Sequence, residues 1–174
     1  ATAVVEYLRL EPGHRVLISS QSHNALDNLA LRILARDRSQ VAVRIVSDHA
    51  VADEKPHPDM IKYRPDEQAS AAVARIEREC QRRLASAPPD DRLLSRLLRA
   101  WMEVAPRVQP ELCDRIRRGA SLVFATTGTC TPRDVGAAGA SGMYDWVIVE
   151  EAARAWPAEL AMPLVRGLRW TLIG

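Results

Sequence analysis

Three short apolar runs, each followed by polar or small residues, constrain the fold more than any other feature of the chain. Val16-Leu17-Ile18 leads into a polar turn, residues 121–126 lead into a loop of small residues, and Trp146 to Val149 leads into two adjacent glutamates. Continuous runs of this kind are typical of strands covered on both faces, as in a parallel sheet. Ligands of such sheets bind at the carboxyl ends of the strands. We therefore expect functional residues directly after these runs.

The remaining pattern predicts further strands that alternate with helices. We expect helices over residues 1–10, 24–36, 66–86, 90–104 and 110–118, and strands over residues 14–19, 41–46, 121–126, 145–149 and 169–173. Strands separated by helical crossovers predict a parallel, doubly wound α/β sheet. The abundance of Ala, Leu, Val and Ile, with few aromatic residues, suits helices packed on such a sheet.

The middle of the chain differs from its two ends. Between about residues 47 and 118 the sequence is charged, rich in proline and without a convincing strand. Two amphipathic helices that break at Pro88-Pro89 predict an αα-hairpin. We therefore divide the chain into a sheet domain, residues 1–47 and 119–174, and a helical insertion, residues 48–118.

Composition excludes several classes of protein. A formal net charge of +2 is too small to demonstrate a nucleic-acid partner, so a basic surface would have to come from local clustering. One candidate is the helical stripe of Arg92, Arg96 and Arg99, for which a solvated helix face is the simpler interpretation. The three cysteines are far apart and form no metal-ligand spacing, which indicates reduced thiols in a cytoplasmic protein. No apolar run reaches the ~18 residues of a membrane span.

Glu150 and Glu151 follow the third buried run directly. A carboxylate at the end of a buried strand is costly to desolvate unless a positive group meets it. In phosphoryl-transfer enzymes that group is nucleotide-bound magnesium, and a second acidic residue orients the attacking water. The alternative is that both glutamates begin a helix and meet its positive end. The pair alone leaves both interpretations open.

Three blocks of the sequence together resemble the first RecA-like domain of superfamily 1B helicases, in the branch that contains the nonsense-mediated-decay and replication helicase-nuclease families. Residues 16–29, 122–129 and 146–159 are similar to motif Ia, to motif Ic, and to the Walker B motif with the segment after it. Residues 171–174 are similar to the strand that enters motif III. The order and spacing agree with the family, and bacterial members are the most similar.

The resemblance implies an ATP-dependent helicase or translocase that acts on single-stranded DNA or RNA, with ATP and Mg²⁺ as cofactors. Glu151 would polarise the attacking water, and Glu150 would hold the magnesium ion. Apart from the resemblance, Arg154 lies three residues after Glu151, from where it could reach the γ-phosphate. The residues that match nucleic-acid contacts of the family are Ser20, Gln21, Ser22, His23, Thr126, Thr127 and Thr129. Hydroxyls and amides suit a phosphate backbone without sequence preference. The resemblance also implies a second RecA-like domain in the same protein.

The sequence departs from the family in two ways. The family has Asp followed by Glu, whereas Glu150 carries one extra methylene and would hold magnesium with a shifted backbone or through water. The phosphate-cradling G-x-x-x-x-G-K-[ST] loop is absent from the sequence. Because the family places this loop just before a helix like residues 1–10, we expect the chain to be an excerpt of a longer protein whose phosphate loop lies upstream.

Several of these residues have structural alternatives. Ser22 could cap the helix that follows it, alone or together with a functional role. The Thr126–Thr129 turn could be an ordinary turn after a strand, and Arg154 could pair with Glu150. Asp27 also matches a family position, but a single acidic residue on a helix is more often structural.

The alternative function is a catalytically degenerate domain of the same fold that serves as a nucleic-acid-binding or assembly module. The glutamate at position 150 keeps this hypothesis open. A Rossmann-type enzyme is disfavoured, because no G-x-G-x-x-G follows a strand.

Overall fold

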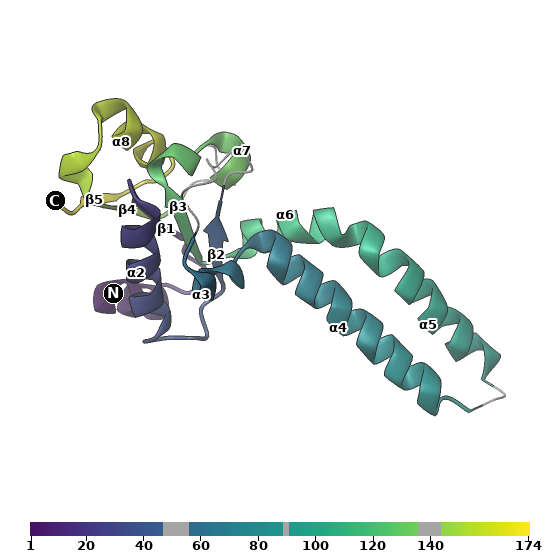
Figure 1. The fold of residues 1–174 in the computed structure, drawn as a ribbon. Helices are drawn as coiled ribbons and strands as arrows, with labels where there is room; N and C mark the ends of the chain where they lie inside the picture. Colours follow the sequence, from purple (N-terminus) through teal and green to yellow (C-terminus); the bar gives the residue numbers. More distant parts are fainter. Residues whose placement is uncertain (47–55, 89–90, 136–143) are drawn as a thin grey trace. The chain divides into compact units, whose positions relative to one another are not determined.

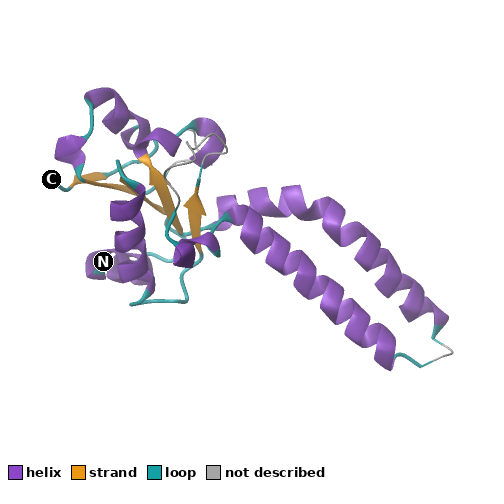
Figure 2. Cartoon of the chain, viewed as in Figure 1, coloured by secondary structure: helices purple, strands orange, loops and turns teal. Residues whose placement is uncertain are grey.

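A five-stranded parallel sheet forms the centre of the fold, in the order β2-β3-β1-β4-β5 (Figures 1 and 2). The computed structural model describes residues 1–46, 56–88, 91–135 and 144–174. The strands are β1 (Val16–Ser20), β2 (Ala42–Ile45), β3 (Leu122–Thr126), β4 (Trp146–Glu150) and β5 (Trp170–Leu172). All four strand pairings are parallel, which confirms the predicted α/β class.

Helices pack on one face of the sheet through a shared apolar core. These are α1 (Thr2–Leu10), α2 (His23–Leu34) and the short α3 (Pro58–Ile61). Their apolar residues, including Val5, Leu26 and Met60, meet strand residues such as Ile18 and Phe124 in a single cluster. The alternating strand residues are buried too, since Leu17, Val123 and Val147 are fully inaccessible to solvent. Burial on both faces explains why the strands appear in the sequence as continuous apolar runs.

The boundaries of the strands differ from the predictions by one or two residues. β1 begins two residues later than predicted and includes Ser20, and β4 includes Glu150 as its last residue. Pairing in the ladder extends both strands into their polar ends, because the neighbouring strand supplies hydrogen bonds regardless of side chain. The remaining elements on the sheet are η2 (Thr127–Thr129), α7 (Pro132–Val135), η3 (Ala152–Arg154) and α8 (Pro157–Leu164). Part of the expected small-residue loop after β3 lies outside the described residues.

The described residues form two compact units. The first comprises residues 1–64 and 117–174, and the second comprises residues 65–116. The sequence placed the boundary at residue 47, which lies outside the described residues. The segment before α4 lies with the sheet because Met60 is fully buried in the sheet core and the backbone N–H of Arg44 donates to the carbonyl of Tyr63 at 2.8 Å.

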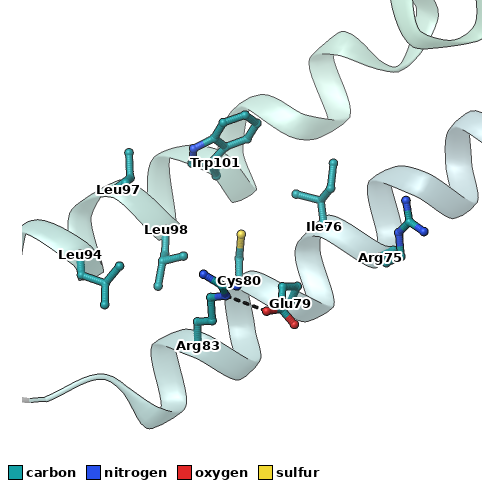
Figure 3. Close-up of a pocket in the computed structure, with 9 residues that line it drawn as sticks. All are labelled: Arg75, Ile76, Glu79, Cys80, Arg83, Leu94, Leu97, Leu98 and Trp101. Carbon is teal, nitrogen blue, oxygen red and sulfur yellow. Dashed lines mark hydrogen bonds and ion pairs between the residues drawn. The ribbon is translucent and has the colours of Figure 1, made fainter.

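The second unit is a pair of long helices followed by shorter ones. It contains α4 (Pro65–Ser86), α5 (Arg92–Val104), η1 (Ala105–Val108) and most of α6 (Gln109–Gly119), with no strand among its described residues. A groove of about 520 Å³ lies between α4 and α5 (Figure 3), and its apolar lining includes Leu98 and Trp101. The arginine stripe of α5 is exposed. None of the helices within the described residues is long and apolar enough to cross a membrane.

A buried ion pair links a strand and a helix inside the first unit. The guanidinium of Arg44 on β2 donates to Asp27 on α2 at 2.7 Å, and both side chains are almost inaccessible to solvent. The second carboxylate oxygen of Asp27 accepts from the backbone N–H of His57 at 2.7 Å, just before α3. Burial lowers the pKa of Arg44, and the charge of Asp27 opposes that effect. The geometry therefore supports a structural role for Asp27.

We predict that Asp27→Ala lowers the free energy of unfolding by about 3–5 kcal/mol, because it leaves the Arg44 charge buried without its carboxylate. The measurement is urea denaturation at neutral pH. The double variant Asp27→Leu with Arg44→Met should lose less stability than Asp27→Ala, since no charge then remains buried. The exposed pair Glu111–Arg115 provides the control, and Glu111→Ala should cost about 1 kcal/mol or less. A small effect of Asp27→Ala would contradict this account.

Candidate functional site

The carboxyl ends of three adjacent strands bring the candidate residues together. In the sheet register Ser20 lies directly beside Thr126 on one side and Glu150 on the other. All three are the last residues of their strands. Residues more than 100 positions apart in the sequence therefore end at one edge of the sheet, where the segments that follow them form a common surface.

Glu150 ends β4 with one carboxylate oxygen unpaired. Its Oε2 is buried and has no hydrogen-bond partner among the residues that the structure describes. Burial raises the pKa of Glu150, and the neighbouring negative charge of Glu151 raises it further, while Arg32 and the amino-terminal ammonium act in the opposite direction. A buried acceptor without a donor is costly. The site is therefore suited to a positive group that does not come from the described part of the chain.

Glu151 turns the chain away from the strand in a left-handed conformation. Its φ is 57° and its ψ is 33°, and it is the one non-glycine residue with positive φ among the described residues. Such a conformation costs an L-residue roughly 1–2 kcal/mol. The backbone is held there because the N–H of Ala152 donates to the carbonyl of Ile173 at 2.8 Å, and the N–H of Ile173 donates to Val149 at 2.9 Å. Strain of this kind is common at functional sites.

Three side chains donate to the carboxylate of Glu151. The hydroxyls of Ser20 and Ser22 each lie 3.4 Å from Oε2. Arg154 lies 3.1 Å from Oε1 and is largely exposed. The predicted ion pair of Arg154 with Glu150 is wrong, because Arg154 pairs with Glu151. Glu151 is the N-cap residue of the three-residue η3 but makes no side-chain cap hydrogen bond, whereas Glu150 is the last residue of β4. The alternative in which both glutamates begin a helix therefore holds for the position of Glu151 alone.

The polar turn after β1 has both structural and exposed members. The hydroxyl of Ser22 accepts from the N–H of Ala25 at 3.2 Å and caps α2, as its structural alternative predicted. Gln21 is exposed and its amide donates to Glu159 at 3.4 Å. His23 is buried, and its Nδ1 lies 3.0 Å from the Arg44 guanidinium. Gln21 and Ser22 are thus the accessible residues of this turn, and the nucleic-acid role of all four remains a prediction.

The threonines after β3 are folded against one another. The hydroxyls of Thr126 and Thr129 lie 3.1 Å apart, and Thr129 also donates to the carbonyl of Thr126 at 3.0 Å. Thr127 is buried as well, whereas Gly128 is exposed and a methyl group added to it would meet no atom within 4 Å. The backbone at Gly128 is therefore the part of this loop most open to a ligand, and contacts through the threonine side chains stay a prediction.

Sequence reasoning missed two features of the site. Glu159 on α8 accepts from the N–H of Trp156 at 3.0 Å as well as from Gln21, and so links the segment after β4 to the turn after β1. The pair Asp27–Arg44 reaches the same turn through His23. The arginine inside the apolar run of residues 41–46 was the available signal, because an arginine in a strand covered on both faces must have a buried partner.

The described residues contain no cluster of three or more His, Cys, Asp or Glu side chains that could hold a metal ion. An all-protein metal cage is therefore not formed among them. Mg²⁺ is instead commonly bound through one or two carboxylates together with phosphate oxygens and water. The unpaired oxygen of Glu150 fits that mode of binding, since it is a buried anionic acceptor at the end of a central strand.

Comparison with known protein families identifies the domain. A family model described as an AAA domain matches residues 2–174, and the chain belongs to this family of helicase-like P-loop NTPase domains. The fold agrees, because the sheet is all-parallel and flanked by helices as in RecA-like domains. No curated protein matches the chain.

We predict that Glu150→Gln stabilises the protein in the absence of nucleotide and magnesium, by about 1 kcal/mol or less. The substitution removes a half-buried negative charge that lies beside Glu151 and whose buried Oε2 has no donor among the described residues. The free energy of unfolding at neutral pH is the measurement. The exposed Glu111 serves as the control, and Glu111→Gln should change stability by less than about 0.5 kcal/mol. A destabilised Glu150→Gln variant would show that the carboxylate has a stabilising partner.

Proposed function

We propose that this domain is the first RecA-like domain of an ATP-dependent helicase or translocase of the superfamily 1B type, acting on single-stranded DNA or RNA. The observation that carries the proposal is the pair of carboxylates at the end of β4. One is half-buried and has a buried oxygen without a donor among the described residues, and the other stands in a strained turn beside the polar turn after β1. Membership in a P-loop NTPase family makes a nucleotide and Mg²⁺ the natural ligands of such a pair.

The two carboxylates divide the chemistry of ATP hydrolysis. The unpaired oxygen of Glu150 would hold the magnesium ion that accompanies ATP. Bound magnesium supplies the positive charge that stabilises the phosphate oxygens during transfer. Glu151 accepts a hydrogen bond from the attacking water and orients it. Arg154, which is largely exposed, turns its guanidinium towards the γ-phosphate.

Single-stranded nucleic acid binds across the ends of β1 and β3. Gln21 and Ser22 present polar groups there, and the backbone at Gly128 is open to a phosphate. Ser20, His23, Thr126, Thr127 and Thr129 support this surface from positions that are buried in the structure. Contacts of this type bind the backbone of a strand without reading its sequence.

The complete ATP site needs groups that are absent from these 174 residues. We propose that a phosphate-binding loop and a second RecA-like domain of the same protein supply them. The three free cysteines favour the reducing environment of the cytoplasm.

We predict that Glu151→Gln in the full-length protein lowers nucleic-acid-stimulated ATP turnover by at least about 100-fold, because the amide orients the attacking water poorly. Nucleotide binding, measured with a fluorescent ATP analogue, should persist. Glu11→Gln is the control, since Glu11 is exposed and has no role in the proposed site. The ATP turnover of this variant should equal that of the natural protein. Unchanged turnover in Glu151→Gln would refute the assignment.

The alternative is a degenerate domain that binds nucleic acid without hydrolysing ATP, and the longer side chain of Glu150 is the observation that favours it. Glu150→Asp in the full-length protein separates the two functions. We expect the natural protein to hydrolyse ATP. The ATP turnover of the variant should differ from it by less than about tenfold, since magnesium keeps several waters and tolerates the shorter side chain. An inactive natural protein that remains inactive, or gains activity only with Asp, would support the degenerate module.

A further inference from the structure

The helix α5 leaves most of its large apolar side chains exposed. Leu98 is the one buried residue of this helix, whereas Leu93 is 80% exposed and Trp101 is 52% exposed. The exposed apolar residues recur along α5 and into η1 at intervals of three or four residues, and we call them the α5 strip: Leu93, Leu97, Trp101, Val104 and Val108. A contiguous exposed apolar surface of this kind marks an interaction site.

The α5 strip borders the groove between α4 and α5. Leu97 and Trp101 belong to both, and Ile76 and Cys80 of α4 lie on the opposite wall of the groove (Figure 3). Alternating intervals of three and four residues are those through which one helix packs along another. The part of the strip from Leu93 to Val104 is roughly 17 Å long, which is the length of about three helical turns. The groove therefore has the spacing and length to receive a third helix.

The charged residues on the α4 wall of the groove are mainly cationic. Arg75 and Arg83 line it together with one acidic residue, Glu79. The carboxylate of Glu79 is already occupied, because it accepts from Arg82 at 2.8 Å and from Arg83 at 2.6 Å. Arg75 has no acidic partner within the described part of the chain. This wall therefore has a positive charge that a bound partner could neutralise.

The helix α5 adds further positive charge. It contains Arg92, Arg96 and Arg99 but a single acidic residue, Glu103, which pairs with Arg107 at 2.8 Å. Arg96 adjoins the α5 strip, because it follows Leu93 by three residues on the helix surface. A second copy of the chain, seated by its own α5, would bring the same arginines to the groove, and like charges oppose such pairing. The charges favour an acidic occupant instead.

We propose that the groove between α4 and α5 is a docking site for an amphipathic helix of another protein, with apolar residues at intervals of three and four and with Asp or Glu at the flanking positions. The apolar side of that helix covers Leu97 and Trp101, and its carboxylates pair with Arg75 and Arg96. Binding requires neither ATP nor nucleic acid, so this site is separate from the proposed function of the sheet unit.

The test uses a designed, fluorescein-labelled helical peptide of about 15 residues. It has leucine at intervals of three and four, glutamate at the flanking positions and glutamine elsewhere. Its binding to the full-length protein is measured by fluorescence anisotropy without nucleotide, in about 0.1 M salt. We expect a dissociation constant in the micromolar range. A matched peptide with lysine in place of every glutamate should bind at least about tenfold more weakly, because its charges repel the arginines.

Leu97→Glu in the full-length protein should weaken binding of the glutamate peptide at least about tenfold, since a carboxylate then replaces an apolar contact at the centre of the strip. Leu10→Glu is the control, because Leu10 is 77% exposed but lies on α1. This control variant should bind the peptide as the natural protein does. Both residues are exposed, and circular dichroism verifies that each variant keeps its helical content.

A charge exchange tests the role of the arginines. In the double variant Arg75→Glu with Arg96→Glu, the lysine peptide should bind more tightly than the glutamate peptide, by at least about threefold. Arg78→Glu is the matched control, since Arg78 is exposed on α4 but does not line the groove. The preference for the glutamate peptide should persist in this control.

Several outcomes would overturn the proposal. Absence of binding, equal binding of the two peptides, or unchanged binding in Leu97→Glu would each remove the acidic helix as the occupant of the groove. A dimer of the full-length protein that Leu97→Glu dissociates, detected by analytical ultracentrifugation, would assign the groove to a second copy. Binding to phosphatidylserine vesicles that Leu97→Glu abolishes would assign the α5 strip to a membrane surface.

Discussion

The pairing of β1 with both of its neighbours determines where every candidate residue lies. Because β3 and β4 are parallel to β1 and in register with it, three strands end together at Ser20, Thr126 and Glu150. Parallel strands need crossover connections, and the crossover helix α2 together with α1 and α3 supplies apolar cover on one face of the sheet. The polar residues then have a single edge at which to meet water and ligand. The geometry of the site follows from the topology of the sheet.

The elements with strong apolar periodicity were predictable from the sequence. All five strands and the long helices lie where the pattern placed them, with boundaries shifted by one or two residues. These shifts matter at Ser20 and Glu150, which are strand residues in the structure. A strand boundary depends on hydrogen bonds to a neighbour that is distant in sequence, and local pattern carries no information about that neighbour.

The environment of the polar residues was much harder to predict. His23 and Thr127 looked like surface groups of a turn, yet both are buried. Arg44 sits in a run of β-branched residues and requires Asp27, which lies on a helix 17 positions earlier. Side-chain burial is a property of the packed domain, so the same polar turn can be exposed at Gln21 and inaccessible at Ser20.

The two glutamates after β4 lower the stability of the domain compared with other residues that could occupy the same positions. A glycine at position 151 would adopt the left-handed turn without strain, and an amide at position 150 would avoid a half-buried charge beside Glu151. The chain has glutamate at both positions and compensates with donors from Ser20, Ser22 and Arg154, all of them directed to Glu151. Glu150 receives none of these hydrogen bonds. A domain that stabilised both carboxylates internally would have no unsatisfied acceptor for a cation, and the uneven distribution of donors is therefore the observation on which we propose Glu150 for the metal ion and Glu151 for the water.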